Sequence, residues 1–253
     1  SKKMNHTTVI NQFIDLGYKG LKEAYLRQIE DINYHDLSFE DRLYQLLEAQ
    51  DIFLNNKRTA MNLKLSRIKD KLAAIELIDY DPKRKINKAQ ILSLASMDFI
   101  RSHQNLIING KTGSGKSNLA QALGIRAIQD GFTVYYIRTA TLLEDIKHSR
   151  IDGTYTNLVK RFARYKLLIL DDFGVSAISV DDATNLFEII EARNQLCSTI
   201  ITSQLPVKDW YGYLQNNTVA DAILDRVVHS SHRVTLEGDS LRPKYGKIDE
   251  NYE

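Results

Sequence analysis

The sequence predicts an α/β fold: a parallel sheet flanked by helices, preceded by a small all-helical N-terminal domain. From Pro82 onward, short apolar segments rich in β-branched residues alternate with helical segments, which is typical of βαβ units around a buried sheet. Upstream of Asp79 the pattern is helical only. Because proline restricts the preceding residue and ends helices, we place a domain boundary there. The expected domains are residues 1–81, which are basic and suited to bind DNA or a partner, and residues 82–253.

The N-terminal domain is expected to contain a helical pair around Gly17 and Gly20 and then one long helix. Apolar residues of the long helix recur at alternating spacings of four and three, which marks one helical face. They are Met61, Leu65, Ile68, Leu72 and Ile75, extended upstream by Leu43, Leu46, Leu47 and Leu54. With Ser38 as its N-cap, this helix is expected to reach about residue 78.

The C-terminal domain is expected to alternate strands with helices. Strands are expected at residues 106–108, 132–137, 167–170, 198–202 and 233–236. Helices are expected at residues 116–128, 139–147, 180–193 and 219–228, with a further helix ending near residue 164. Since parallel strands need crossover connections, this order predicts a parallel sheet.

Composition limits the function classes. The 253 residues include 34 Lys and Arg against 32 Asp and Glu, a net charge of +2, so any basic surface must be local. No segment approaches the roughly 20 apolar residues that cross a bilayer, and the polar start does not resemble a signal peptide. The single cysteine, Cys197, cannot form an intrachain disulfide, which fits a reducing compartment. We therefore expect a cytoplasmic protein with no membrane partner.

The strongest motif is Gly-Lys-Thr-Gly-Ser-Gly-Lys-Ser at residues 110–117, which satisfies G-x-x-x-x-G-K-[ST] in full. It follows an expected strand and opens an expected helix, so a merely flexible turn is the weaker alternative. Glycines let the backbone curve around phosphate oxygens, Lys116 supplies a cation to the β- and γ-phosphates, and the Ser117 hydroxyl can ligate Mg²⁺. The expected nucleotide-binding residues are Gly110, Lys111, Thr112, Gly113, Ser114, Gly115, Lys116, Ser117 and Asn118. The sequence therefore predicts a P-loop NTPase.

An acidic pair follows the apolar strand at residues 167–170. Acids at the carboxyl end of a buried strand reach the edge where open α/β sheets bind ligands. Asp171 is the candidate for holding Mg²⁺, and Asp172 is the candidate for orienting the attacking water. The alternative is that both are turn residues. The upstream phosphate loop favours the catalytic interpretation.

Three further positions are weaker candidates. Ser203 or Gln204, after the next strand, can hydrogen-bond the γ-phosphate or its water, or can belong to an ordinary strand exit. Arg226 lies on an apolar helix and can reach a phosphate across a subunit interface, or can pair within its own chain. Arg193 has the same two interpretations.

Basic residues gather in two segments. Residues 57–88 hold ten basic and four acidic side chains, a local net charge of +6. The candidate phosphate contacts there are Lys57, Arg58, Lys64, Arg67 and Lys71. A second cluster contains Lys147, Arg150, Lys160, Arg161 and Arg164, and the first four of these are its candidate contacts. Ordinary surface charge is the alternative in both segments. No base-reading motif is present, so contact with DNA is expected to involve phosphates and shape.

Together these motifs resemble the IstB/DnaC branch of AAA+ ATPases. The resemblance covers about residues 85 to 242 and is carried by GKTGSGKS, LLILDDFG, STIITSQLP and ADAILDR. The segments SQLP and SHRVTLEGDSLR are most similar to the IstB family, ATP-dependent helpers of bacterial insertion-sequence transposases. The N-terminal part is similar only in being small, helical and basic.

The resemblance implies an AAA+ module without the usual C-terminal lid. Residues 110–117 would be its Walker A motif and Asp171-Asp172 its Walker B motif, with ATP and Mg²⁺ as cofactors. Ser203 would lie near sensor 1, and Arg226 would be the arginine finger. The active species would be an ATP-dependent homo-oligomer that binds and bends double-stranded DNA, selects the target site and stimulates a cognate transposase. DNA contacts would lie near the second basic cluster.

One departure from the family pattern concerns the Walker B motif. Many AAA+ proteins carry Asp-Glu there, whereas this chain carries Asp171-Asp172. The shorter Asp172 would stand farther from the water, so we expect slow turnover, which suits a switch whose ATP state holds the oligomer on DNA.

Three other functions remain open from the sequence. A DnaC-like helicase loader shares most of these motifs but would prefer single-stranded DNA. A small-molecule P-loop kinase would act as a monomer without DNA, which the long basic N-terminal helix disfavours. A protein that binds nucleotide without hydrolysing it would show no turnover.

Overall fold

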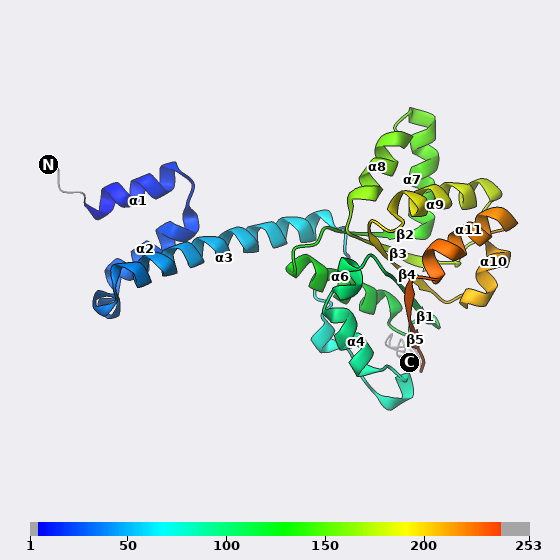
Figure 1. The fold of residues 1–253 in the computed structure, drawn as a ribbon, viewed down its shortest axis with the longest axis horizontal. Coiled ribbons are helices and arrows are strands. Elements are labelled where there is room, and N and C mark those ends of the chain that lie inside the picture. Colours follow the sequence, from blue (N-terminus) through cyan, green and yellow to red (C-terminus); the bar gives the residue numbers. More distant parts are fainter. Residues whose placement is uncertain (1–4, 239–253) are drawn as a thin grey trace, which may run out of the picture. The chain divides into compact units, whose positions relative to one another are not determined.

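The computed structural model describes residues 5–238 and divides the chain into two compact units, Ser1–Met61 and Asn62–Glu253 (Figure 1). The expected boundary lay near residue 81, so about twenty residues assigned to the helical domain belong to the second unit. Residues 239–242, the end of the SHRVTLEGDSLR motif, lie outside the described part. None of the helices within residues 5–238 combines the length and apolar character that crossing a membrane requires.

The first unit is helical, as expected. Its elements are α1 (His6–Asp15), α2 (Lys19–Glu30), the 3₁₀ helix η1 (Ile32–Asp36) and α3 (Phe39–Leu65). The Ser38 hydroxyl accepts the backbone N–H of Asp41 at 3.1 Å and so caps α3. Gly20 lets α2 approach α3 closely, because a Cβ there would lie 2.7 Å from the Ala49 carbonyl oxygen.

The expectation of one helix reaching residue 78 is wrong, since α3 ends at Leu65. The Ser66 hydroxyl donates to the Leu63 carbonyl at 2.7 Å, and Arg67 adopts a left-handed φ of 61°. The Ser66 carbonyl then accepts the backbone N–H of Tyr136 at 2.7 Å, so the chain joins the second unit at this point. Side-chain capping and a left-handed residue end the helix, although the apolar spacing continues.

The apolar residues beyond this turn belong to the core of the second unit. Ile68 and Ile75 are buried in it, whereas Leu72, in the same apparent stripe, is 84% exposed. Ile75 lies in the 3₁₀ helix η2 (Ile75–Leu77). The 4-3 spacing of Ile68, Leu72 and Ile75 therefore does not mark a helix, because these residues belong to an irregular segment in which each has its own surroundings.

The second unit contains every expected strand. They are β1 (Asn105–Gly110), β2 (Val134–Arg138), β3 (Leu167–Phe173), β4 (Ser198–Ser203) and β5 (Ser231–Leu236). All pair in parallel in the order β2-β3-β4-β1-β5. β4 lies between β1 and β3, and the three strands run in the same direction. The loops that follow them therefore lie side by side at one edge of the sheet.

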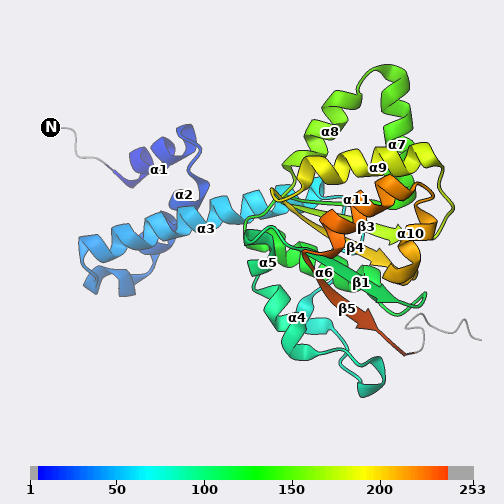
Figure 2. The ribbon, with the colours of Figure 1, turned by 45° about the vertical axis from the view of Figure 1, so that its right-hand side comes forward.

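Helices cover both faces of this sheet (Figure 2). Before β1 come η3 (Pro82–Arg84), α4 (Lys88–Ala95) and α5 (Asp98–Arg101), and after it come α6 (Lys116–Gln129), α7 (Thr139–Asp152), α8 (Tyr155–Arg164), α9 (Val180–Arg193), η4 (Val207–Asp209), α10 (Trp210–Tyr213) and α11 (Asn217–Val228). One core cluster joins α4, α5 and α6 to the sheet, and the other joins α7 to α11 to its opposite face. Successive strand residues alternate between the two: Leu168 and Leu170 face one cluster and Ile169 the other. Both faces are therefore apolar, which explains the continuous apolar strands.

Candidate active site

The loop between β1 and α6 has the backbone that a phosphate cradle requires. Gly113 and Gly115 have φ angles of 79° and 93°, which side-chain-bearing residues rarely adopt. A Cβ on Gly110 would lie 2.5 Å from the Ser114 hydroxyl and 2.7 Å from the Leu236 carbonyl oxygen. The loop ends where α6 begins, so the positive end of this helix lies beside it.

A segment from before β1 supports the loop. Arg84 is buried, and its guanidinium donates to the Ser114 carbonyl at 2.8 Å and to the Asp79 carbonyl at 2.8 Å. Arg84 could not be expected at the site from the sequence, because no local pattern indicates that residues 79–84 fold against the loop.

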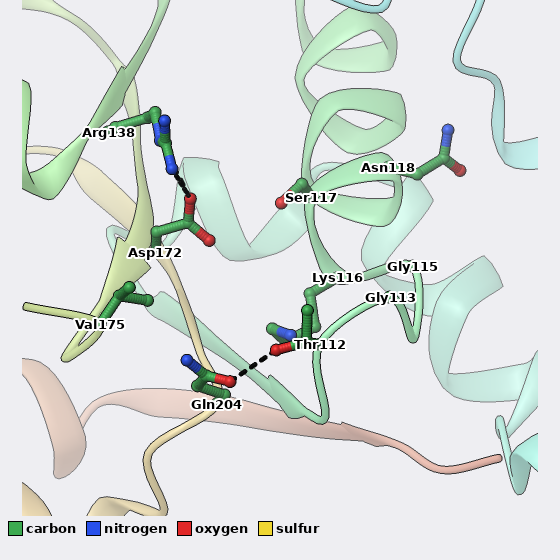
Figure 3. A pocket seen from close by; sticks show the side chains of 10 residues that line it. All are labelled: Thr112, Gly113, Gly115, Lys116, Ser117, Asn118, Arg138, Asp172, Val175 and Gln204. Carbon is green, nitrogen blue, oxygen red and sulfur yellow. Dashed lines mark hydrogen bonds and ion pairs between the residues drawn. The ribbon is translucent and has the colours of Figure 1, made fainter. Parts of the chain in front are cut away.

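A cavity of about 680 Å³ opens beside the loop (Figure 3). It is lined by Thr112, Gly113, Gly115, Lys116, Ser117, Asn118, Arg138, Asp172, Val175 and Gln204. These residues come from the phosphate loop, from the start of α6 and from the ends of β2, β3 and β4. The fold thus brings six of the expected nucleotide-binding residues to one cavity with Asp172.

The two expected Mg²⁺ ligands lie side by side. The Ser117 hydroxyl donates to Asp171 Oδ1 at 2.8 Å, although 54 residues separate them in the sequence. Asp171 is only 2% exposed. A hydroxyl and a carboxylate at the mouth of a phosphate loop are the hard oxygen ligands that Mg²⁺ takes together with phosphates and water, so the residues fit this ion.

Two more hydroxyls fix the Asp171 carboxylate. Tyr136 of β2 donates to Oδ2 and Thr202 of β4 donates to Oδ1. Burial and the neighbouring Asp171 raise the pKa of the Tyr136 phenol, so it stays protonated and remains a donor. The sequence gives no signal for Tyr136, because its proximity depends on the pairing of β2 with β3.

Asp172 is held in an ion pair inside the cavity. Its Oδ2 lies 2.8 Å from Arg138 Nη2 and 3.0 Å from Arg138 Nε, and the pairing raises the pKa of the guanidinium. Asp172 has a left-handed φ of 57°, and its backbone N–H donates to the Thr202 hydroxyl at 3.0 Å. Figure 3 shows the other carboxylate oxygen turned toward the cavity. Arg138 was not among the residues expected from the sequence.

The residues after β4 divide into one buried and one cavity-lining side chain. Ser203 is fully buried; its hydroxyl donates to the Phe173 carbonyl at 2.6 Å and accepts the Leu205 N–H at 3.0 Å. Gln204 lines the cavity, and its Oε1 accepts the Thr112 hydroxyl at 2.7 Å (Figure 3). Of the two alternatives, Gln204 therefore has the geometry to meet a bound phosphate or its water.

Lys116 lies at the start of α6 and also lines the cavity. Its Nζ donates to the Lys111 carbonyl at 2.8 Å, across the base of the loop. An ammonium held there can move to phosphate oxygens without leaving the loop that carries it.

Arg226 lies away from the cavity of its own chain. It is on α11, and its carbonyl accepts the Asn105 side-chain amide at 3.3 Å, at the start of β1 rather than at the end that leads into the loop. Its guanidinium pairs with Glu191 and lies 5.3 Å from the centre of the Phe187 ring. Within its own chain, Arg226 therefore makes a surface ion pair.

Arg193 is a structural residue. It is 1% exposed, and its guanidinium donates to three backbone carbonyls, those of Phe162, Tyr165 and Ser198. Burial lowers the pKa of Arg193 to about 10. The interpretation of Arg193 as a residue that reaches another subunit is thus wrong, because its donors are used in joining α8, α9 and β4.

The second basic cluster divides between two surfaces. Lys147 pairs with Asp182 at 3.2 Å, and Arg150 donates to Asn185 at 2.8 Å. Lys160 and Arg161 instead line a groove of about 420 Å³, whose wall comprises Thr133, Asn157, Lys160, Arg161, Arg164 and Tyr165.

Arg67, from the first basic segment, lies near the same groove. The positive charges of Arg161 and Arg67 both act to lower the pKa of Tyr165, although burial outweighs them and raises it. The structure thus brings together basic residues that lie almost a hundred positions apart.

The chain matches a family model described as IstB-like ATP binding protein over residues 11–247. The insertion sequence ATP-binding protein y4pL of Sinorhizobium fredii (strain NBRC 101917 / NGR234) is 38% identical over 227 residues, which cover 90% of this chain and 92% of that protein. The insertion sequence IS232 ATP-binding protein of Bacillus thuringiensis subsp. berliner is 32% identical over 234 residues, which cover 91% of this chain and 93% of that protein.

Solved structures show where the fold is shared. DnaI superposes with a TM-score of 0.56 at 20% identity, over 65% of this chain and 90% of that one. The DnaC helicase loader superposes with a TM-score of 0.54 at 21% identity, over 66% and 98%. The likeness is one of fold, the α/β sheet of P-loop AAA+ proteins, as expected from the sequence.

Proposed function

Since the chain belongs to the family of IstB-like ATP binding proteins, we propose that it is the ATP-hydrolysing helper of an insertion-sequence transposase. In this role it assembles as an oligomer on double-stranded DNA, marks the target site and stimulates the cognate transposase. The activity is ATP hydrolysis. The observation that carries the proposal is the Ser117–Asp171 hydrogen bond at the mouth of the phosphate loop, which joins two Mg²⁺ ligands across 54 residues of sequence.

Bound Mg²⁺ would neutralise charge on the β- and γ-phosphates, and Ser117 and Asp171 are the residues that would hold it. The loop backbone from Gly110 to Ser117 and the Lys116 ammonium bind the phosphates. Tyr136 and Thr202 orient the Asp171 carboxylate, and the buried position keeps bulk water from it. These residues therefore position the γ-phosphate before the reaction.

Asp172 would orient the attacking water, and Gln204 lines the same cavity. While Arg138 occupies one carboxylate oxygen, Asp172 has only its other oxygen available to accept a hydrogen bond from the water. A side chain one carbon shorter than Glu also reaches less far into the cavity. Both features favour slow turnover, which is what a switch between assembled and free states needs.

DNA binding is proposed for the groove of Lys160, Arg161, Arg164 and Tyr165, extended by Arg67. Four cations near an aromatic ring suit phosphate contacts that are indifferent to sequence. Lys147 and Arg150 contribute less, because acceptors of their own chain already engage them. The remaining candidate phosphate contacts are Lys57, Arg58, Lys64 and Lys71.

Arg226 is proposed to act on the nucleotide of a neighbouring subunit. Two observations support this: it lies at the other end of the sheet from its own cavity, and its partner Glu191 is at the surface. On assembly, Arg226 would exchange Glu191 for a γ-phosphate.

The test follows ATP turnover and assembly on a labelled duplex together. We expect ATP and Mg²⁺ to increase the sedimentation coefficient of the protein–duplex complex, and Lys116→Ala to abolish both turnover and this increase. Arg226→Ala should still bind ATP but fail to assemble. Preference for single-stranded DNA would favour a helicase loader instead, and turnover that depends on a small-molecule acceptor but not on DNA would favour a kinase.

A further inference from the structure

The segment that follows α3 covers part of the edge strand β2. The Tyr136 N–H of this strand donates to the Ser66 carbonyl at 2.7 Å. Ser66 is fully buried, and its hydroxyl also accepts the Ile68 N–H at 3.2 Å. Because an edge strand has no neighbouring strand on one side, the Ser66 carbonyl takes the place of such a neighbour at this position. Ser66 is therefore fixed to the strand whose Tyr136 side chain holds Asp171.

The same segment is bound to the start of α6 by two side-chain amides. Gln121 Oε1 accepts the backbone N–H groups of Lys69 at 2.9 Å and Asp70 at 3.0 Å, and Gln121 Nε2 donates to the Ser117 carbonyl at 3.1 Å. Asn118 Nδ2 donates to Asp70 Oδ2 at 3.1 Å. Gln121 is buried, so water competes little for its bonds. Because Ser117 and Asn118 line the cavity beside the phosphate loop, the first turn of α6 connects that cavity to this segment (Figure 3).

Both connections lead back to Ser117, so the hydrogen bonds form a ring. On one side, the Ser117 hydroxyl donates to Asp171, which accepts the Tyr136 phenol, and the Tyr136 amide reaches Ser66. On the other side, the Ser117 carbonyl accepts the Gln121 side chain, which holds the next two amides of the segment. An expected Mg²⁺ ligand is thus linked to one short segment by two routes.

Arg67 lies between the two attachment points in a strained conformation. Its φ of 61° is one that side-chain-bearing residues rarely adopt, and it persists only where the surroundings impose it. Here Ser66 is fixed on one side of Arg67 and Lys69 on the other. The Arg67 side chain is exposed, and its charge acts on Tyr165 of the groove proposed for DNA. The ring of hydrogen bonds therefore determines the position of a cation that can meet a DNA phosphate.

We propose that Gln121 couples nucleotide binding to duplex binding by fixing the segment that carries Arg67. The inference rests on the proposed function, which places phosphates at the loop and DNA at the groove. Phosphates in the loop contact the first turn of α6, and Gln121 transmits the position of that turn to Arg67. Bound nucleotide thereby favours the strained conformation of Arg67 beside the groove, and bound duplex favours nucleotide to the same extent. Gln121 lines neither the cavity nor the groove, so it is a positioning residue.

The test measures the affinity of the whole chain for a labelled duplex of about ten base pairs, one helical turn, with and without Mg²⁺ and a non-hydrolysable ATP analogue. So short a duplex restricts assembly, and the ratio of the two dissociation constants reports coupling within one chain. We expect the analogue to tighten duplex binding about tenfold in the wild type, and the ratio to fall to about one in Gln121→Leu. Gln129→Leu, the same change at the exposed end of α6, is the control and should keep the wild-type ratio.

Gln121→Glu separates the two roles of the amide. An ionised Glu still accepts the N–H groups of Lys69 and Asp70 but cannot donate to the Ser117 carbonyl. We therefore expect wild-type duplex affinity without nucleotide and a ratio reduced at least about threefold. Circular dichroism and isothermal titration with the analogue check that each variant folds and binds nucleotide.

Two results would overturn the proposal: a Gln121→Glu variant that folds, binds the analogue and keeps the wild-type ratio, or a wild type whose affinity for the short duplex does not respond to the analogue. If ATP-dependent assembly on a long duplex persists in either case, the proposed function stands without this coupling. A wild type that binds no nucleotide would contradict both.

Discussion

At the scale of single residues, the site depends on how tightly Asp171 is held. Its carboxylate receives hydroxyl groups from α6, β2 and β4, through Ser117, Tyr136 and Thr202. Several donors on one buried carboxylate fix its direction, which prepares Asp171 for the proposed role of metal ligand before any ion arrives. Such a site spends little binding energy on ordering its own side chains.

Tyr136→Phe tests the positioning role of the phenol. The ring fits the same space, but the Asp171 carboxylate loses one donor, so we expect the Mg²⁺ concentration for half-maximal ATP turnover to rise about tenfold. ATP turnover as a function of Mg²⁺ measures this. Tyr135→Phe is the control, because Tyr135 packs against the rings of Phe162 and Tyr165 on the other face of β2. Equal Mg²⁺ requirements in both variants would assign Tyr136 to packing alone.

Glycine at position 110 is required by contact rather than by its φ angle. Gly110→Ala places a Cβ between the Ser114 hydroxyl and the Leu236 carbonyl, so we expect the loop to shift and the affinity for ATP to fall by at least about tenfold. Isothermal titration with ATP measures this loss. Gly212→Ala meets open space and should bind ATP like the wild type. Retained affinity in Gly110→Ala would show that the loop does not need this close approach.

At the scale of elements, the strands and the helical character of the first unit could be predicted, and the point at which α3 ends could not. Strands β1 to β4 carry apolar residues on both faces, because helices cover the sheet twice, and this gives a strong local signal. The edge strand β5 contributes Val234 and Leu236 to one core cluster, and its other face is polar. The turn at residues 66–67 depends instead on the Tyr136 amide, which is distant in sequence, so the apolar spacing there indicated a helix that ends earlier.

The same distinction separates the parts of the site. The phosphate loop and Asp171-Asp172 could be predicted, because each is a contiguous motif whose chemistry requires those residue types. Arg138 reaches the cavity, and Tyr136 reaches the Asp171 carboxylate, only through the order of the strands, which a single sequence does not reveal.

Arg193 connects three elements, and this predicts a large effect on stability. Replacing it with Ala leaves the carbonyls of Phe162, Tyr165 and Ser198 buried without donors, which should cost about 3–5 kcal/mol. Thermal unfolding should show a drop in Tm of several degrees at least. Arg226→Ala should leave Tm nearly unchanged, because its ion pair is at the surface. A similar Tm for both variants would contradict the assignment of Arg193 to structure.

Asp182, at the start of α9, should make the free energy of unfolding depend on pH. Burial alone raises the pKa of Asp182, but hydrogen bonds with Ser179 and the ion pair with Lys147 outweigh it, so the pKa lies below its ordinary value. Because the pKa of Asp182 is lower in the folded protein than in the unfolded chain, its carboxylate stabilises the fold at pH values above the unfolded pKa of about 3.9. This stabilisation is lost as the pH falls through the folded pKa. Asp182→Asn should therefore lower the free energy of unfolding by about 1 kcal/mol at pH 7, with the difference vanishing below pH 4. Urea unfolding at several pH values measures it, and a constant difference would contradict this linkage.

At the scale of the whole molecule, the second unit presents the cavity beside the phosphate loop and Arg226 at opposite ends of its sheet. This arrangement suits the proposed contacts from head to tail between successive subunits, in which Arg226 of one copy would reach the cavity of the next.

The most direct measurement of the central claim is a crystal structure of the chain with a non-hydrolysable ATP analogue and Mn²⁺, whose anomalous scattering locates the ion. The account predicts the triphosphate inside the loop of residues 110–117, with the metal beside the Ser117 hydroxyl and the Asp171 carboxylate. A nucleotide bound elsewhere, or a metal peak away from both oxygens, would contradict it.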